Sequence, residues 1–446
     1  MNTIKKHFVS SPPSGGILRF EVWCRKFLSI IGAWCFIIHQ ASGQSYLIAD
    51  LGIPINAPAS AAEAHGVNAR GSVVGTWWDG GSARGNQYAF WYTNGIIGDL
   101  GTIKKGGYDY AIAYAINDAK QVVGQGTTTG GGGYTYHAFL YTNGVMTDLD
   151  KTGQNWSSAN AINQRGTIVG EFSTPLGLIH AFLYTNNAML DLGTLPGGLY
   201  SSAKGINDSG VIVGEASDAT TNTLAFIYTN GVMNPLGTLG GNYSSAKAIN
   251  NAGVIVGESS LANGETHAFV YSNGFMSDLG TLGGTNSSAI GINNSNLIVG
   301  YALTTNEQAH AFSFDGKGLH DLQQAFSPPP GWTNIFLTLA YGVNDLGHIV
   351  GGVNYITNGV TNYDAFLLYP PPFEILAPSV STVSGNRQMQ MNIQGIPGLR
   401  FAVLTSTNLV DWTAIVTNTL TTDSTNFVDS TFATNRNEYY RAMALP

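Results

Sequence analysis

Residues 246–284 read AKAINNAGVIVGESSLANGETHAFVYSNGFMSDLGTLGG, and this stretch determines how most of the chain folds. Closely similar segments occur just before it, at 203–241, and just after it, at 289–322. The Asn of each Ile-Asn or Val-Asn pair marks seven copies, spaced roughly 43 to 51 residues apart. These residues are Asn68, Asn117, Asn163, Asn207, Asn250, Asn293 and Asn344. A period of about 40–50 residues is typical of four-stranded β-propeller blades.

Each copy contains four short runs that are rich in Val, Ile, Phe and Tyr and bounded by Gly or Asn. In the quoted copy the runs are 246–250, 254–258, 267–271 and 275–279. This pattern predicts four β-strands, and no useful length of the chain has the 3.6-residue period of an amphipathic helix. Asn250 and Asn251 can bond the local backbone of one turn. Asn273-Gly274 is a strong hairpin signal for another.

The two ends of the repeat region complement each other. The last copy ends at Tyr369 without an Asp-Leu-Gly strand, whereas residues 46–52 read YLIADLG and belong to no copy. We therefore expect residues 46–52 to complete the last blade and close a seven-bladed ring, which also protects the sheet edges. An open solenoid is the alternative, but it does not explain why one strand is missing and another is spare.

Residues 1–43 have the features of a secretory signal peptide. Five basic residues precede an apolar segment at 27–38, and Ala41-Ser42-Gly43 supplies small residues before Gln44. The apolar length suits a signal sequence and is short for a membrane span. We expect cleavage before Gln44 and a secreted protein with no membrane span after cleavage. An uncleaved membrane anchor is the alternative.

Composition narrows the classes of function. Both cysteines, Cys24 and Cys35, lie in the leader, so the rest of the chain has neither disulfides nor thiol chemistry. Beyond the leader there are 14 Lys and Arg against 26 Asp and Glu, a net charge of −12. This acidic balance argues against nucleic acid and anionic lipid as partners. We expect a monomer.

Strand order predicts where a ligand binds. The turns between strands one and two, and between three and four, are tight and share one face of the ring. The other connections vary in length and composition and share the opposite face, which we call the variable-loop face. Binding residues concentrate on variable loops held by a rigid frame, and exposed aromatic rings suit sugars or polypeptide. The candidates are Trp77, Trp78, Arg84, Tyr108, Tyr110, Trp156, Tyr200, Tyr243 and Trp332. Packing between blades is the alternative role for these rings.

The sequence predicts no catalytic residue and no metal or cofactor site. The histidine of the His-Ala-Phe motif occurs in four copies of the repeat. Equivalent positions on different blades lie far apart, so these histidines cannot converge on one metal, and we expect local hydrogen bonds instead. They are His137, His180, His267 and His310. The Asp of each Asp-Leu pair and Glu171, Glu215 and Glu258 also recur, and we expect them at turns or strand edges. A glycosidase needs two carboxylates at a set separation, and only loop acids such as Asp79, Asp109 and Asp218 stand outside the repeat.

After Tyr369 the repeat ends, and Pro370-Pro371-Pro372 marks a linker. Residues 373–446 contain short alternating runs that predict a small β-sandwich module. Such a module on an exported protein typically binds a surface or spaces domains.

The words HAFxYxNG, DLGTLGG and AxxINxxGxIVG resemble those of the HAF family of bacterial extracellular repeats, over about 320 residues. The C-terminal part contains STNLVDWT at 406–413 and a closing YYR, and it resembles small β modules at the ends of secreted proteins from Verrucomicrobia-type bacteria. The resemblance implies export and a repeat scaffold. It transfers no catalytic residues to this chain.

We therefore expect an all-β protein with four parts: a signal peptide at 1–43, a seven-bladed β-propeller at 44–369 closed by its N-terminal strand, a proline linker at 370–372, and a β-sandwich module at 373–446. The expected function is binding of an extracellular glycan or protein through the variable-loop face. A polysaccharide-degrading hydrolase or lyase that uses loop acids is one alternative, and a purely structural matrix component is another.

Overall fold

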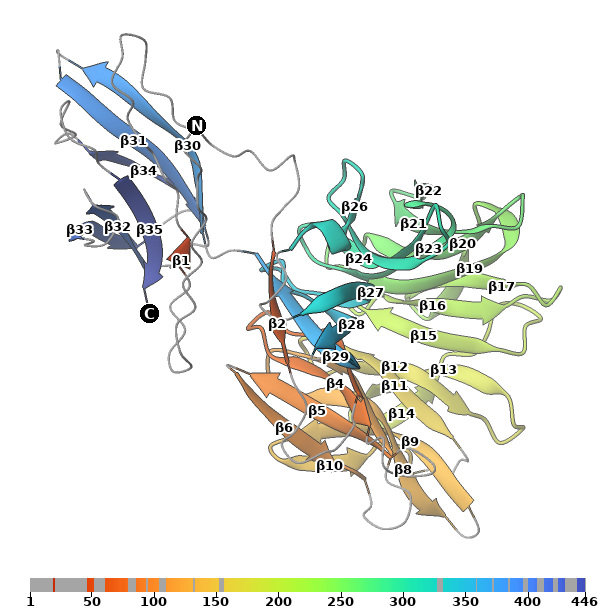
Figure 1. The fold of residues 1–446 in the computed structure, drawn as a ribbon. Helices are drawn as coiled ribbons and strands as arrows, with labels where there is room; N and C mark the ends of the chain where they lie inside the picture. Colours follow the sequence, from red (N-terminus) through yellow and green to blue (C-terminus); the bar gives the residue numbers. More distant parts are fainter. Residues whose placement is uncertain are drawn as a thin grey trace. The chain divides into compact units, whose positions relative to one another are not determined.

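The computed structural model shows an all-β chain in two compact units, one of residues 44–370 and one of residues 1–43 with 371–446 (Figure 1). The described residues are 19–20, 46–51, 61–78, 86–93, 95–103, 110–130, 133–151, 156–326, 332–357, 359–370, 373–383, 386–395, 400–406, 413–419, 424–429 and 439–445. Among them, no helix has the length and apolar character needed to cross a membrane.

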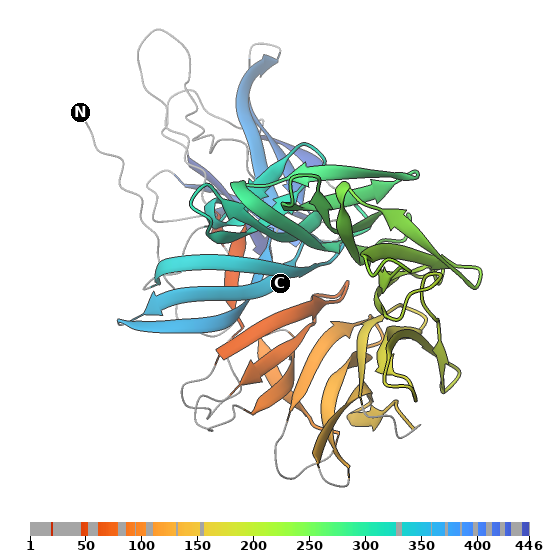
Figure 2. The ribbon, with the colours of Figure 1, turned by 90° about the vertical axis from the view of Figure 1, so that its right-hand side faces the viewer.

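Residues 44–370 form seven blades of four antiparallel strands, arranged in sequence order around one axis (Figure 2). A parallel pairing of Thr266 with Asn286 joins blades 5 and 6 into one eight-stranded sheet. Blade 1 contains β3 (Ala61–Val67), β4 (Val73–Trp78), β5 (Gln87–Thr93) and β6 (Ile96–Gly101). Blade 2 contains β7 (Ala111–Ile116), β8 (Val122–Gly130), β9 (Gly133–Thr142) and β10 (Val145–Asp148). Blade 3 contains β11 (Ser157–Ile162), β12 (Ile168–Ser173), β13 (Ile179–Thr185) and β14 (Ala188–Asp191). Blade 4 contains β15 (Ser201–Ile206), β16 (Ile212–Ser217), β17 (Thr223–Thr229) and β18 (Val232–Gly237).

The last three blades follow the same order. Blade 5 contains β19 (Gly240–Ile249), β20 (Ile255–Leu261), β21 (Thr266–Ser272) and β22 (Phe275–Gly280). Blade 6 contains β23 (Gly283–Ile292), β24 (Ile298–Thr304), β25 (Ala309–Phe314) and β26 (Leu319–Asp321), followed by the 3-10 turn η1 (Leu322–Gln324). Blade 7 contains β27 (Thr333–Val343), β28 (Ile349–Thr357) and β29 (Val360–Tyr369), and its fourth strand is β2 (Leu47–Asp50).

The predicted closure of the ring is confirmed. Strand β2 pairs antiparallel with β29, with Leu47 opposite Tyr369 and Asp50 opposite Phe366. Tyr46 extends this seam, because its N–H donates to Ala325 O at 2.7 Å and its side chain is buried between blades 6 and 7. The first strands of neighbouring blades contact one another all the way round, including β27 with β3. An open solenoid is therefore excluded.

Two residues of the His-Ala-Phe word form the core of every blade. Its Ala and its Phe are 0 % exposed in all seven copies. The phenylalanines are Phe90, Phe139, Phe182, Phe226, Phe269, Phe312 and Phe366. Each packs between sheets, as Phe226 does against Val169 of blade 3 and Ala203 of its own blade. Full burial of such a side chain contributes about 1.5–3 kcal/mol, so these seven rings are a main source of stability.

The first strand of every blade has a β-bulge at the same position. This bulge explains why the second strand of the blade contains a Val-Gly motif. In blade 5 the pairing shifts between Ala246 and Ala248, which leaves Lys247 outside the ladder. Equivalent shifts occur in the other six blades. Beside the bulge, a Cβ added to Gly257 would lie 2.0 Å from the carbonyl oxygen of Ser245. Only glycine fits there, because this carbonyl occupies the place of a side chain.

The other unit contains two antiparallel sheets, as expected for a small all-β module. One sheet contains β30 (Phe373–Val383), β31 (Asn386–Gly395) and β34 (Ser424–Asp429). The second contains β32 (Arg400–Ser406), β33 (Thr413–Thr419) and β35 (Tyr439–Leu445), and β1 (Arg19–Phe20) pairs with β35. Apart from β1, residues 1–43 lie outside the described residues, so the signal peptide stays a prediction.

Candidate functional site

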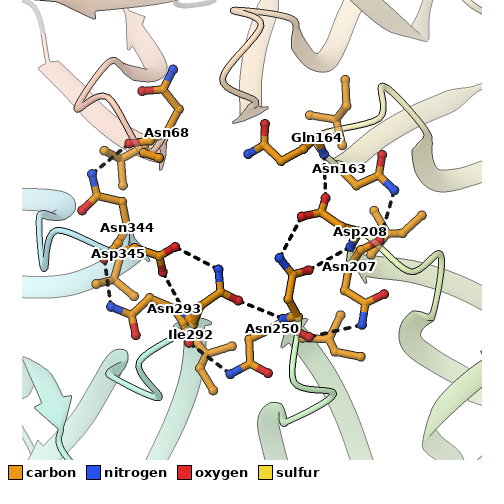
Figure 3. Close-up of a pocket in the computed structure, with 18 of the residues that line it drawn as sticks. Asn68, Asn163, Gln164, Asn207, Asp208, Asn250, Ile292, Asn293, Asn344 and Asp345 are labelled. Atoms are coloured by element: carbon orange, nitrogen blue, oxygen red, sulfur yellow. Dashed lines mark hydrogen bonds between the residues drawn. The ribbon is translucent and has the colours of Figure 1, made fainter.

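The Asn residues that mark the repeat join all seven blades into a ring of hydrogen bonds, which we call the asparagine belt (Figure 3). Each Asn donates from Nδ2 to the backbone carbonyl of the Asn in the next blade, at 2.8–3.2 Å. The belt closes where Asn344 donates to Asn68 O at 2.8 Å. Each Oδ1 accepts from its own turn, as Asn250 does from Ala252 and Val254. The sequence predicted these local bonds but not the links between blades.

A second ring of hydrogen bonds runs beside the belt. The residue after each belt Asn donates its backbone N–H to the side-chain oxygen of the equivalent residue in the next blade, at 2.8–2.9 Å. Its members are Ala69, Asp118, Gln164, Asp208, Asn251, Asn294 and Asp345. This second ring is open at the junction of blades 7 and 1, because Ala69 has no side-chain oxygen to accept from Asp345.

The belt surrounds a pocket of about 180 Å³ on the tight-turn face. The pocket is lined by the two rings and by the Ile or Val that precedes each belt Asn. Polar atoms of its rim are largely bonded to one another, as Asp208 accepts from both Gln164 N–H and Asn251 Nδ2. Within the described residues, no group of three or more His, Cys, Asp or Glu could hold a metal ion. The two rings of hydrogen bonds hold neighbouring blades together at this end of the axis.

Three residues before each belt Asn, on the variable-loop side of the belt, the bulges place one side chain per blade on the inner side of the ring. These bulge residues are His65, Tyr114, Asn160, Lys204, Lys247, Ile290 and Tyr341. Three of them contact one another across blade boundaries. The ring of His65 is 4.9 Å from that of Tyr341 in blade 7 and 5.8 Å from that of Tyr114 in blade 2.

Blades 3 to 5 contribute a group of amines, carboxylates and phenols, which we call the charged wall. Lys204 Nζ lies 3.6 Å from Glu171 and 4.0 Å from Glu215, and Lys247 Nζ lies 3.1 Å from Glu258. Two tyrosine hydroxyls donate to the same carboxylates, Tyr200 to Glu215 at 2.8 Å and Tyr243 to Glu258 at 2.7 Å. The members of the charged wall are Lys204, Lys247, Glu171, Glu215, Glu258, Tyr200 and Tyr243.

Two carboxylates of this wall, Glu215 and Glu258, have lowered pKa values. Burial by itself would raise the pKa of Glu215, but the ammonium groups of Lys204 and Lys247 outweigh it, so the net pKa is below its usual value. The same balance, with Lys247 and the Tyr243 hydroxyl, lowers the pKa of Glu258. The lysines and glutamates therefore form ion pairs at neutral pH, and they are only partly buried.

Blades 7, 1 and 2 contribute an aromatic group on the opposite arc of the ring. Glu63 accepts hydrogen bonds from the hydroxyls of Tyr341, at 3.3 Å, and Tyr363. Burial opposes the ionisation of Glu63, but hydrogen bonds from His65 and Tyr363 bring its pKa below the usual value. The indole of Trp78 lies 5.8 Å from the ring of Tyr363. We call His65, Tyr114, Tyr341, Tyr363 and Trp78 the aromatic wall.

Of the predicted ligand residues that the structure describes, three belong to the two walls and the others make different contacts. Tyr200 and Tyr243 belong to the charged wall, and Trp78 belongs to the aromatic wall. Two indoles instead stack within the fold: Trp77 on Tyr88 at 4.4 Å and Trp332 on Tyr355 at 3.7 Å. Both also pack against the cores of their blades.

The other candidates lie between blades or outside the described residues. The ring of Tyr110 meets Tyr136 edge-on at 4.9 Å. Trp156 forms an isolated β-bridge with the same Tyr136. Arg84 and Tyr108 lie outside the described residues. So do the loop acids Asp79 and Asp109, while Asp218 accepts N–H bonds from its own turn.

Sequence reasoning missed the bulge residues and misplaced the glutamates. The prediction that Glu171, Glu215 and Glu258 lie at turns or edges is wrong, because each is inside the second strand of its blade. A signal was available in the word Ala-x-Ala/Gly-Ile/Val-Asn. Its second position holds His, Tyr, Asn, Lys or Ile, whereas the other positions of this motif vary little.

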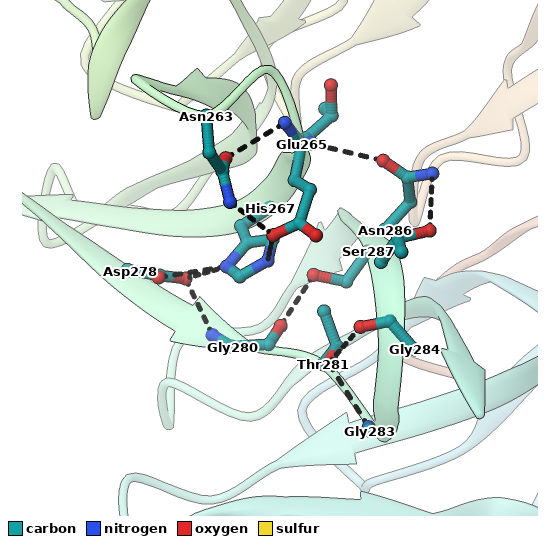
Figure 4. Close-up of polar contacts among 12 residues, drawn as sticks. Asn263, Glu265, His267, Asp278, Gly280, Thr281, Gly283, Gly284, Asn286 and Ser287 are labelled. Carbon is teal, nitrogen blue, oxygen red and sulfur yellow. Dashed lines mark hydrogen bonds and ion pairs between the residues drawn. The ribbon is translucent and has the colours of Figure 1, made fainter. Parts of the chain in front are cut away.

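The repeated His and Asp make the local contacts that the sequence predicts (Figure 4). His267 Nδ1 lies 2.9 Å from the carboxylate of Asp278, which also accepts the Gly280 N–H at 2.7 Å. The same pairing joins His137 to Asp148, His180 to Asp191 and His310 to Asp321. The pairs fasten the third strand to the fourth in these blades, which is a structural role.

Comparison with known proteins identifies no family for this chain. No protein-family profile matches the chain, and no curated protein matches it significantly. Among solved structures, the chain is similar to TolB from Acinetobacter baumannii, with 11 % identity, a TM-score of 0.37, and coverage of 71 % of this chain and 65 % of that one. It is also similar to a fungal alcohol oxidase of the AA5 family in complex with copper, with 12 % identity and a TM-score of 0.40. The match covers 91 % of this chain and 93 % of the oxidase. A glycoside hydrolase matches at 9 % identity with a TM-score of 0.24, and the match covers 91 % of this chain and 96 % of that one. Such distant similarities concern the fold alone.

Proposed function

We propose that this protein is an exported repeat scaffold of the HAF type that binds a glycan at the variable-loop end of the propeller axis. The observation that carries the proposal is the ring of bulge residues. In a repeat where nearly every other inner position is constant, the bulges present a charged wall on one arc and an aromatic wall on the other.

The chemistry of the two walls suits a hydroxyl-rich ligand. Amines, carboxylates and phenols can donate and accept hydrogen bonds with sugar hydroxyls, and aromatic rings offer apolar surface beside them. The charged wall holds three carboxylates against two amines, and each amine is already ion-paired. Neutral polysaccharides therefore fit better than anionic ones, which this surplus of negative charge would repel.

Ionisation of the site supports binding over hydrolysis. A glycosidase needs one carboxyl with a raised pKa to serve as the general acid. Glu63, Glu215 and Glu258 instead have lowered pKa values, so each carries its charge at neutral pH.

Affinity electrophoresis against neutral, amino and acidic polysaccharides tests the proposal. The variant Lys247→Ala should bind a retained neutral polysaccharide at least about tenfold more weakly, because a hydrogen bond to a charged group typically contributes about 1.5–3 kcal/mol. The matched control is Lys317→Ala, whose lysine lies in an exposed hairpin of blade 6.

Equal affinity of the Lys247→Ala variant and the unchanged chain, with both folded by thermal melting, would place the ligand elsewhere. Retention by no polysaccharide would favour a protein ligand, and release of oligosaccharides would favour an enzyme. Export is tested separately, because the secreted chain should begin at Gln44.

A further inference from the structure

The seam that closes the ring has a different acid–base pair from the other blades. In blade 7 the slot of the repeated histidine holds Asp364, and the slot of its partner holds Asp50 from the closing strand β2. Four other blades pair a histidine with an aspartate at these slots. The closing strand therefore brings a carboxyl group to another carboxyl group.

One hydroxyl group lies within hydrogen-bonding distance of both carboxyl groups. The Tyr355 hydroxyl is 2.8 Å from Oδ2 of Asp364 and 3.2 Å from Oδ2 of Asp50. Its position is fixed, because the Trp332 indole stacks on the Tyr355 ring at 3.7 Å and 6°. A hydroxyl has a single proton, so it can satisfy one carboxylate at a time. A proton added to one of the two carboxyl groups reduces the charge of the pair from −2 to −1 and removes the repulsion between two carboxylates.

We propose that this carboxyl pair makes closure of the propeller pH-dependent: a proton on Asp364 tightens β2 against β29, and loss of that proton loosens the seam because two carboxylates then repel each other across it. Each other blade is a continuous stretch of chain. Blade 7 alone joins strands from the two ends of the propeller, so its outer strand pair decides whether the ring is closed.

The surrounding groups determine the sign of the effect. Burial, and then the charge of Asp50, raise the pKa of Asp364 to about 6. On β2 itself, burial raises the pKa of Tyr46 to about 12, so Tyr46 stays neutral. Strand β3, which packs against β29, carries Glu63 and His65, and these are bonded to Tyr341 and Tyr363 or to each other.

A carboxyl group whose pKa is raised in the closed state binds its proton more tightly there than in the open state. The stabilisation is therefore present at acid pH and is lost as pH rises through about 6. With an ordinary value of 3.8 for the opened seam, the closed-to-open ratio should rise about tenfold between pH 7.5 and pH 5.

Hydrogen exchange of the β2 amides in the full chain measures this ratio after correction for the intrinsic effect of pH. The unchanged protein should show the tenfold gain in protection at pH 5, and Asp364→Asn should abolish the gain. The matched control is Asp191→Asn in blade 3, which removes an equivalent outer-strand carboxyl away from the seam and should leave the gain unchanged.

Two further variants keep the test informative if Asp364→Asn does not fold. Asp50→Asn should move the midpoint of the gain to lower pH, because it removes the repelling charge. Tyr355→Phe should move it to higher pH, because the hydroxyl stabilises the ionised form of Asp364. The absence of a gain in the unchanged protein, or the same midpoint in all variants, would overturn the proposal. Neither result depends on glycan binding.

Discussion

The glycine of the Val-Gly motif is needed because a carbonyl group occupies the space of its side chain, and not because it lies in a turn. At Gly257 a Cβ would lie 2.0 Å from the Ser245 carbonyl oxygen and 2.9 Å from the Phe269 ring. The bulge turns that carbonyl toward the second strand while it turns Lys247 toward the axis. The glycine and the axial lysine are therefore two consequences of a single backbone feature.

Replacing this glycine should destabilise the propeller. Gly257→Ala must displace either the bulge or the buried Phe269 ring, and overpacking of this kind typically costs about 1–3 kcal/mol. The loss should appear as a lower midpoint in chemical denaturation. The control is Gly318→Ala, where an added Cβ meets nothing within 4 Å. Equal stability of the two variants would show that the bulge can relax at little cost.

Some residue roles follow from the sequence because they act on their own neighbourhood. The turn around Asn250 and the pairing of His267 with Asp278 need only the local pattern. Lys247 and Tyr341 could not be assigned in this way. Their positions depend on a register shift, and a register shift is defined only once two strands are paired.

At the scale of the strand and turn, the two hydrogen-bonded rings connect one blade to the next. The asparagine belt is closed through Asn344 and Asn68. The second ring is open at the same junction, since Ala69 offers no acceptor there. Sequence periodicity predicted the strands and hairpins, because these are local. The contacts between blades join residues 43 to 51 positions apart, or 276 at the seam, and no local pattern reports them.

Completing the second ring should stabilise the propeller. Ala69→Asn supplies a side-chain oxygen for the backbone N–H of Asp345, matching the six bonds at the other junctions. A net hydrogen bond contributes about 0.5–1.5 kcal/mol, so the thermal midpoint should rise by a degree or more. Ala69→Leu fills the same space without an acceptor and should give no increase. A similar rise in both variants would attribute the effect to packing.

The whole molecule depends on a strand that is separated from its blade by most of the chain. Strand β2 covers the edge of β29 and brings two buried side chains, Tyr46 at 2 % exposure and Leu51 at 4 %. The sequence predicts that β2 completes blade 7, because residues 46–52 contain the Asp-Leu-Gly motif that the last copy lacks. It could not predict the carboxyl pair at the seam, because Asp50 and Asp364 appear as unrelated residues until the strands are paired.

Deleting residues 46–51 should therefore open the ring and expose a sheet edge. Loss of the two buried side chains alone removes about 3–6 kcal/mol, at about 1.5–3 kcal/mol each. The uncovered edge of β29 is a ten-residue strand with buried Phe366 and Leu368, and such edges pair with other chains. We expect a lower thermal midpoint and self-association, measured by light scattering after size-exclusion chromatography. A synthetic peptide of residues 45–52 should restore the monomer, because it supplies the same strand in trans, whereas a peptide of the same composition in scrambled order should not. A deletion variant that stays monomeric with an unchanged midpoint would mean that the asparagine belt alone holds the seven blades together.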